Sequence, residues 1–234
     1  EFAQSNDPTT GQRALAIESL AFINHRSAAD AMLTLCDNPL TKKDATYWLF
    51  RNAIGEWRGY DLMAELKKRG IYDPDKVVAL SIAAPRQEQP KFSVEDVLKL
   101  EGNAAKGKTT ATRCIMCHQV DGAGIDYGPS LKGWGGGQPA DVIARAIVDP
   151  TADISHGFKG TTLQLKDGKK IQGLALAKTD PTTITSTGGV TQLIPRKMIK
   201  KQSGMNYSLM LSADQMGLSP QDVADLVAFL KEYK

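Results

Sequence analysis

Long apolar runs are missing from this sequence. No window approaches the roughly 18 consecutive apolar residues that a membrane-spanning helix needs. No positively charged stretch followed by an apolar core stands at the N-terminus either, so we expect that any secretory signal has been removed or was never part of this sequence. The 234 residues include 41% hydrophobic and 24% charged ones, which is an ordinary composition for a soluble globular protein. We expect no membrane span in this chain.

A strong excess of charge of one sign is also missing from the chain as a whole. The net charge of +3 is too small to indicate a nucleic-acid partner, so we expect none. The charge is unevenly spread, because residues 159–201 contain nine lysines or arginines and two acidic residues. This local excess is either a docking face or the solvated surface of a lysine-rich hairpin.

Cysteine is scarce, with three in the chain, and this number excludes a disulfide framework. Cys36 falls on the apolar side of a predicted helix, where a single cysteine usually behaves as a small buried hydrophobic residue. We assign it no role. The other two, Cys114 and Cys117, are separated by two residues.

The first part of the chain has the pattern of short amphipathic helices separated by turn residues. Apolar residues recur at helical spacing from residue 10 to about 83. A shift of 31 residues aligns Ala14 with Ala45 and Leu35 with Leu66, which indicates two copies of a helical hairpin. We therefore predict an N-terminal helical-repeat domain, similar to short HEAT-type repeats, at residues 1–83.

The second part begins after a polar stretch with two prolines at residues 84–91, which we predict to be a linker. Residues 92–234 then form the second domain. From Thr161 the period changes from helical to alternating, which predicts a small antiparallel β insertion at about residues 160–200, with four strands ending at Ile194. Ser219 and Pro220 open a final helix. The fold class is therefore mainly α.

The strongest signal in the sequence is the CxxCH motif made by Cys114, Cys117 and His118. Two thiols at this spacing can add to the two vinyl groups of one porphyrin, and the adjacent imidazole then reaches the iron. A zinc site would need a second ligand pair, and the other histidines, His25 and His156, are isolated. A thioredoxin-like redox pair would need a strand before the motif, where we expect a helix. The motif predicts one covalently bound haem c.

With this motif, residues 92–234 resemble class I cytochrome c, and more closely the C-terminal haem-binding domain of large secreted proteins from planctomycetes and verrucomicrobia. The resemblance rests on four features in order: the CxxCH motif, the segment from Gly128 to Leu131, the strand-rich insertion, and the segment from Ser208 to Met210 before the closing helix. In that family, HEAT-type repeats often precede the haem domain, and a sugar-dehydrogenase-like domain can precede those.

The resemblance implies roles for particular residues. Cys114 and Cys117 would form the thioethers, and His118 would be the proximal iron ligand. The carbonyl of Pro129 would accept a hydrogen bond from the other ring nitrogen of His118. Leu131 would complete the haem-binding segment that begins with Gly128 and Pro129.

The sixth ligand implied by the resemblance is Met210. The family usually has a proline directly after this methionine, whereas this chain has Leu211. Met205 is the nearest substitute, and His156 would give a bis-histidine site instead. The metal ligands that we predict are therefore His118 and Met210.

A six-coordinate iron leaves no open position for a substrate, so we predict electron transfer rather than enzymatic chemistry. The alternative is a haem enzyme or gas-binding module with an open distal site. A further hypothesis makes the helical repeats a scaffold that holds a partner. The resemblance implies a periplasmic or secreted protein that accepts electrons from a redox partner protein or from an upstream dehydrogenase domain.

Overall fold

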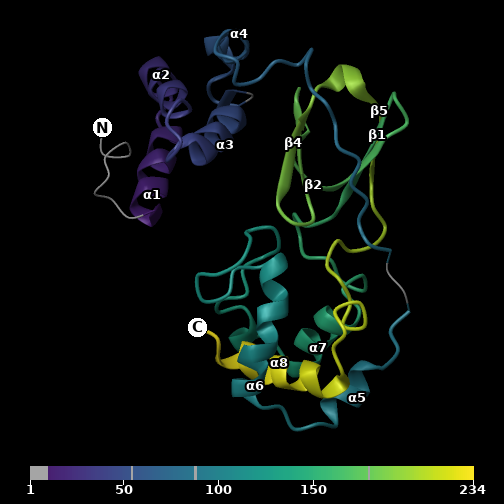
Figure 1. Ribbon diagram of the computed structural model, residues 1–234. Coiled ribbons are helices and arrows are strands. Elements are labelled where there is room, and N and C mark those ends of the chain that lie inside the picture. Colours follow the sequence, from purple (N-terminus) through teal and green to yellow (C-terminus); the bar gives the residue numbers. More distant parts are fainter. Residues whose placement is uncertain (1–9, 54, 87–88, 179) are drawn as a thin grey trace. The chain divides into compact units, whose positions relative to one another are not determined.

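The computed structural model describes residues 10–53, 55–86, 89–178 and 180–234 (Figure 1). Helices account for 41% and strands for 14% of the structure, so the mainly α prediction holds in outline, with one antiparallel five-stranded sheet added to it. Gln87 and Glu88 of the predicted linker and Thr179 of the predicted insertion lie outside the described residues, as do residues 1–9 and Ile54 of the predicted repeat domain.

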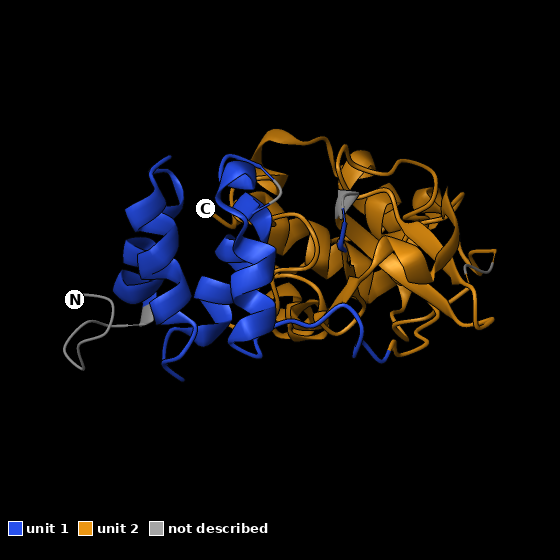
Figure 2. Cartoon of the chain, turned by 90° about the horizontal axis from the view of Figure 1, so that it is seen from above, with its two compact units in different colours: residues 1–78, 179–181 blue, residues 79–178, 182–234 orange. Residues whose placement is uncertain are grey.

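The chain divides into two compact units (Figure 2). The first contains residues 1–78 together with 179–181, and the second contains residues 79–178 and 182–234. The domain boundaries expected from the sequence, at residues 83 and 92, stay predictions. Among the described residues, no helix is both long and apolar enough to cross a membrane.

The first unit is helical. Its elements are α1 (Thr10–Ala21), α2 (Arg26–Leu35), α3 (Lys42–Ala53), the short 3-10 helix η2 (Arg58–Tyr60) and α4 (Leu62–Lys68). Trp57 is fully buried, and its indole nitrogen donates a hydrogen bond of 3.1 Å to the backbone oxygen of Ile23. Asn52 donates a hydrogen bond of 2.7 Å to the backbone oxygen of Ala21. These two side chains tie the end of α3 to the end of α1.

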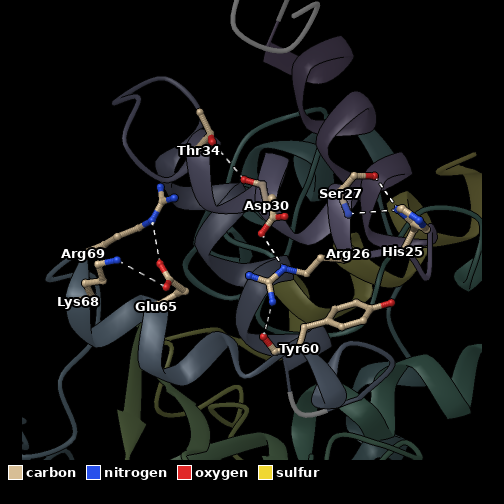
Figure 3. A network of polar contacts seen from close by, with 9 residues as sticks. All are labelled: His25, Arg26, Ser27, Asp30, Thr34, Tyr60, Glu65, Lys68 and Arg69. Atoms are coloured by element: carbon tan, nitrogen blue, oxygen red, sulfur yellow. Dashed lines mark hydrogen bonds and ion pairs between the residues drawn. The ribbon is translucent and has the colours of Figure 1, made fainter.

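Polar contacts at the surface of this unit join side chains to each other and to the backbone (Figure 3). Arg26 contacts Asp30 at 2.9 Å and the backbone oxygen of Tyr60 at 2.8 Å, so it links α2 to η2. Glu65 of α4 lies 3.9 Å from Arg69, the residue directly after that helix. Exposed ion pairs of this kind contribute little stability each, so the unit depends mainly on its buried apolar residues.

The helices of the second unit pack closely because glycines remove side chains from the contact. They are α5 (Val94–Leu98), α6 (Ala104–Thr110), α7 (Ala140–Val148) and α8 (Pro220–Glu232), with the 3-10 helices η3 (Ala111–Met116) and η4 (Gly135–Gly137). A Cβ atom on Gly107 would lie within 2.0 Å of the backbone oxygen of Asp225, so α6 can approach α8 here only with glycine. Asp225, which is buried, accepts a hydrogen bond of 2.8 Å from the backbone of Asn103.

The sheet has the strand order β4-β3-β2-β1-β5 and is antiparallel throughout. Its strands are β1 (Thr161–Leu165), β2 (Lys170–Lys178), β3 (Thr182–Ser186), β4 (Val190–Ile194) and β5 (Ile199–Gly204), the last preceded by η5 (Arg196–Met198). The sequence pattern missed β5, because its lysine-rich sequence lacks the alternation of apolar and polar residues that marks the other strands. Leu163, Ile171 and Ile184 are fully buried in the core of the sheet.

The segment from Ala79 to Ala84 packs along this sheet. Ile82 forms a bridge with Ile171 of β2. The side-chain amide of Gln192 on β4 pairs with both backbone groups of Leu80, at 2.8 and 3.1 Å. A side chain thereby replaces the backbone contacts that a further strand would make.

Candidate functional site

The turn that ends η3 brings the residues of the motif together. The backbone nitrogens of Cys117 and His118 both donate to the carbonyl of Cys114, at 3.0 and 2.8 Å. The carbonyl of Cys117 in turn accepts hydrogen bonds from Tyr127 and Gly128. The segment after the motif is therefore folded back onto the motif.

His118 is held in one orientation by the segment that follows. Its Nδ1 atom lies 2.7 Å from the carbonyl oxygen of Pro129, and because a carbonyl only accepts, Nδ1 carries the proton. Nε2 is then the basic nitrogen, and it has no hydrogen-bond partner among the described residues. A Cβ atom on Gly128 would lie 2.4 Å from the Cε1 atom of the ring, so glycine is needed for this packing.

Burial keeps all three side chains of the motif neutral. It raises the pKa of the Cys114 thiol to about 11, with a smaller effect from the neighbouring Cys117, whose own pKa burial also raises. Burial lowers the pKa of His118, although the hydrogen bond to Pro129 opposes this. The cysteines therefore lack the lowered thiol pKa of disulfide oxidoreductases, and the imidazole is in the form that binds metals.

A mostly apolar cavity lies next to the motif, and all six residues predicted to bind the cofactor line it. These are Cys114, Cys117, His118, Pro129, Leu131 and Met210. Helix α8 adds Leu226 and Leu230 to the wall, and α7 adds Ile147. The six residues come from three separate segments of the chain, and the fold brings them to one space. Their assignment as cofactor ligands stays a prediction.

The segment that carries Met210 is tied to the rest of the unit by several hydrogen bonds. The Met210 nitrogen donates to the Ser208 hydroxyl, and the Ser208 nitrogen donates to the Thr151 hydroxyl, both at 3.1 Å. Arg113, next to the motif, donates to the carbonyls of Met216 and Gly217 at 3.0 and 2.9 Å. The residue before the first cysteine thus anchors the segment that follows Met210.

The other candidates for a sixth ligand are placed differently. Met205 is buried in a cluster with Leu174 and is not among the described residues that line the cavity. His156 is exposed, although the neighbouring Ser155 lines the cavity. Met216 also lines the cavity.

Some wall residues were missed by reasoning from the sequence. Phe158 precedes β1, and Leu174 lies on β2, yet both line the cavity. By the alternation of β2, Leu174 faces the side opposite Ile171 of the sheet's core, and no local signal says against which segment it packs. The wall residues from α7 and α8 have a helical spacing that shows an apolar face but not what that face contacts.

One family model, described as cytochrome c, matches residues 104–166, which is roughly a quarter of the chain. A search of curated proteins finds no match. The family match supports a c-type cytochrome, and with it covalently bound haem c and electron transfer through that group in general terms.

The donor set agrees with this chemistry. Two protonated thiols and an imidazole with a free Nε2 line one apolar cavity, which are the groups that thioether formation and axial ligation require. In the part of the chain that the structure describes, no three histidine, cysteine or carboxylate side chains gather as a metal-binding cluster of their own. The residues present therefore fit haem c.

Proposed function

We propose, from the premise of a cytochrome c domain at residues 104–166, that this chain is a one-electron carrier with a single haem c attached through Cys114 and Cys117. The observation that carries the proposal is the single cavity that Cys114, Cys117, His118 and Met210 all line. When bound, haem c supplies a one-electron ferric/ferrous couple.

His118 would serve as the proximal ligand, and its surroundings prepare it for this role. The hydrogen bond from Nδ1 to Pro129 fixes the tautomer and the ring orientation, and it makes Nε2 a stronger donor. Gly128 leaves room for the ring beside the backbone. Leu131 contributes apolar surface to the same wall and so helps to exclude water.

Met210 would be the sixth ligand. Its support is its place on the cavity wall and the hydrogen bonds that anchor its segment through Ser208 and Thr151. A thioether in this position closes the metal to small molecules and raises the reduction potential relative to a second histidine. The site then favours electron exchange over chemistry on a bound substrate.

The helical unit fits a larger arrangement of the planctomycete and verrucomicrobial type, in which helical repeats precede the haem domain. A shift of 31 residues brings the bounds of α1 to within one residue of those of α3, and it brings α2 onto η2 and the start of α4. This correspondence supports a pair of HEAT-like hairpins. Covalent haem attachment occurs outside the bacterial cytoplasm, so a periplasmic or secreted location belongs to the proposal.

The redox partner would be an acidic protein or an upstream dehydrogenase domain. Residues 159–204 contain nine basic and two acidic residues, whereas the rest of residues 92–234 contains eight basic and twelve acidic ones. Gln164 pairs with Lys170 on one side and Lys201 on the other, so the two lysines share one face of the sheet. Such a concentrated positive charge favours docking of a negatively charged surface.

The test is the visible spectrum of the oxidised protein, inspected for the weak long-wavelength band of sulfur-to-iron ligation. The band should be present in the wild type, absent in Met210→Ala and retained in Met216→Ala, which truncates the other methionine on the cavity wall. The reduced wild type should bind carbon monoxide poorly. Rapid binding together with no band would support an open distal site instead.

A further inference from the structure

The sheet forms part of the cavity wall. Leu174 of β2 lines the cavity and is 8% exposed, and Phe158, just before β1, lines it as well. Leu174 belongs to the same apolar cluster as Tyr127, against which Cys117 packs. The insertion and the motif are therefore in contact through a shared apolar cluster.

The base of the sheet also leads directly into the segment that carries Met210. The nitrogen of Met205, which follows β5, donates a hydrogen bond of 2.8 Å to the oxygen of Gly160, which precedes β1. A Cβ atom on Gly160 would lie 2.7 Å from the sulfur of Met205 and 3.1 Å from Cγ of Leu209. The start of β1 is thus packed tightly against the residue before Met210.

A side-chain amide on β2 holds the same segment from a second direction. The Nε2 atom of Gln172 donates to the hydroxyls of Tyr207 and Thr162, at 3.2 and 3.0 Å, and Oε1 accepts from the backbone of Ala84 at 2.9 Å. Tyr207 lies between β5 and Met210 in the chain. Gln172 therefore connects the sheet to the segment that must hold Met210 in place.

We propose that this sheet is a working part of the haem site, with Leu174 excluding water from the cavity and the Gln172–Tyr207 bond positioning Met210. The inference rests on the proposed function, because it assigns Leu174 and the Gln172–Tyr207 bond an effect on the bound haem. Apolar surroundings disfavour the more positive oxidised iron, so Leu174 raises the reduction potential. A segment held from two sides presents the methionine sulfur with less freedom, so the Gln172–Tyr207 bond strengthens its ligation.

The first experiment compares Leu174→Ala with Leu176→Ala. Both remove a leucine side chain from β2, but Leu176 is 51% exposed and does not line the cavity among the described residues. Leu174→Ala should lower the midpoint potential and speed carbon monoxide binding to the reduced protein severalfold, while Leu176→Ala should match the wild type. A Leu174→Ala protein with wild-type potential and binding rate would overturn the role of Leu174.

The second experiment uses Tyr207→Phe, which keeps the ring and removes only the hydroxyl that Gln172 contacts. Its control is Tyr60→Phe in the helical unit, where the lost hydrogen bond, to Asn24, has the same length of 3.2 Å. In Tyr207→Phe the long-wavelength sulfur band should disappear at a lower temperature than in the wild type. Equal temperatures for wild type, Tyr207→Phe and Tyr60→Phe would overturn the positioning role.

Different results would overturn the proposed function and the role of the sheet. A wild-type protein without covalent haem, or with a sulfur band that survives Met210→Ala, would overturn the proposed function and this inference with it. If the wild type shows the expected band and the Leu174 and Tyr207 variants behave like the wild type, the proposed electron transfer would be retained. The sheet would then have no role in the haem site.

Discussion

The two units place their reactive side chains differently. In the helical unit, the buried side chains of Asn52 and Trp57 donate hydrogen bonds to backbone oxygens. In the second unit, Cys114, Cys117 and His118 line a mostly apolar cavity, and His118 Nε2 has no hydrogen-bond partner among the described residues. Polar side chains whose hydrogen bonds are made within the protein stabilise the fold. Polar side chains without such a partner can bind a ligand. The contrast agrees with the proposal that the chemistry of this chain lies in the second unit.

The largest effect that separates the two units is expected from the cysteines. Cys114→Ser combined with Cys117→Ser should abolish covalent cofactor attachment, because no thiol remains beside the cavity. Cys36→Ser in the helical unit should leave attachment at the wild-type level. The mass of the denatured, purified chains measures both results, and loss of the added mass in Cys36→Ser would break the comparison.

Trp57→Ala should have a large effect on the stability of the helical unit and none on the cofactor site. Trp57 is fully buried, so the substitution leaves a cavity in the core of the helical unit. This unit should therefore lose about 3–5 kcal/mol of its free energy of unfolding. The visible spectrum should not change, since Trp57 is not among the described residues that line the cavity. Circular dichroism and absorption during the same thermal scan check this, and an altered spectrum at low temperature would show that the units are coupled.

A smaller effect is expected from Gly128→Ala. The new methyl group would overlap the His118 ring, so this substitution should destabilise the second unit by about 1–3 kcal/mol and weaken the hydrogen bond to Pro129. Gly59→Ala is the matched control in the helical unit, where a Cβ atom would meet nothing within 4 Å. Thermal unfolding measures the loss, and equal melting temperatures for both variants would contradict the packing argument.

The helix caps should give an effect of about 1 kcal/mol. Ser219 caps α8 and exchanges hydrogen bonds with Asp222, so Ser219→Ala should cost about that much unfolding free energy, whereas Ser19→Ala on the exposed side of α1 should cost little.

The same cap predicts a pH dependence. Hydrogen bonds from Ser219 hold the pKa of Asp222 below its ordinary value of 3.8. The folded state therefore favours the charged carboxylate, and this contribution is present above about pH 4 and is lost as the pH falls through the lowered pKa. Urea unfolding at pH 3 and pH 6 should show a smaller difference in Asp222→Asn than in the wild type, and an unchanged difference would remove Asp222 from the account.

The smallest change in stability is expected from the basic face of the sheet. Lys170→Glu with Lys201→Glu should elute from a carboxylate cation exchanger at clearly lower salt than Lys42→Glu with Lys43→Glu, although both pairs change the net charge equally. All four lysines are exposed, so stability should stay within about 0.5 kcal/mol of the wild type. Equal elution would mean that the positive charge of the sheet is not concentrated enough to act as a docking face.

Much of the fold could be predicted because most of its helices and strands show in the pattern of neighbouring residues. The residue spacing of the helices and the alternation in β1 to β4 are visible in any short window, and the serine caps mark where helices begin. β5 could not be found this way, since Lys200 and Lys201 place charge where alternation would need an apolar residue. Its pairing with β1 is a tertiary contact that overrides local preference.

In the candidate site, too, the residues that are close in sequence could be predicted, and those that the fold brings together could not. Cys114, Cys117 and His118 lie within five residues, so their spacing alone indicates what they can bind. The contribution of Leu174 depends on how β2 twists and where its pairing with β3 shifts, between Ala175 and Ala177. The link between Gln172 and Tyr207 joins positions 35 residues apart. No local pattern records such contacts, and the sheet's part in the site emerges only from the folded chain.

The central claim is that one covalently bound haem c in this chain carries single electrons. A spectroelectrochemical titration of the intact protein, purified from a host that exports and matures c-type cytochromes, tests it most directly. The account predicts sharp visible bands that change reversibly in a single step with a one-electron slope. A protein without such bands, or one whose bands change irreversibly or with a two-electron slope, would contradict it.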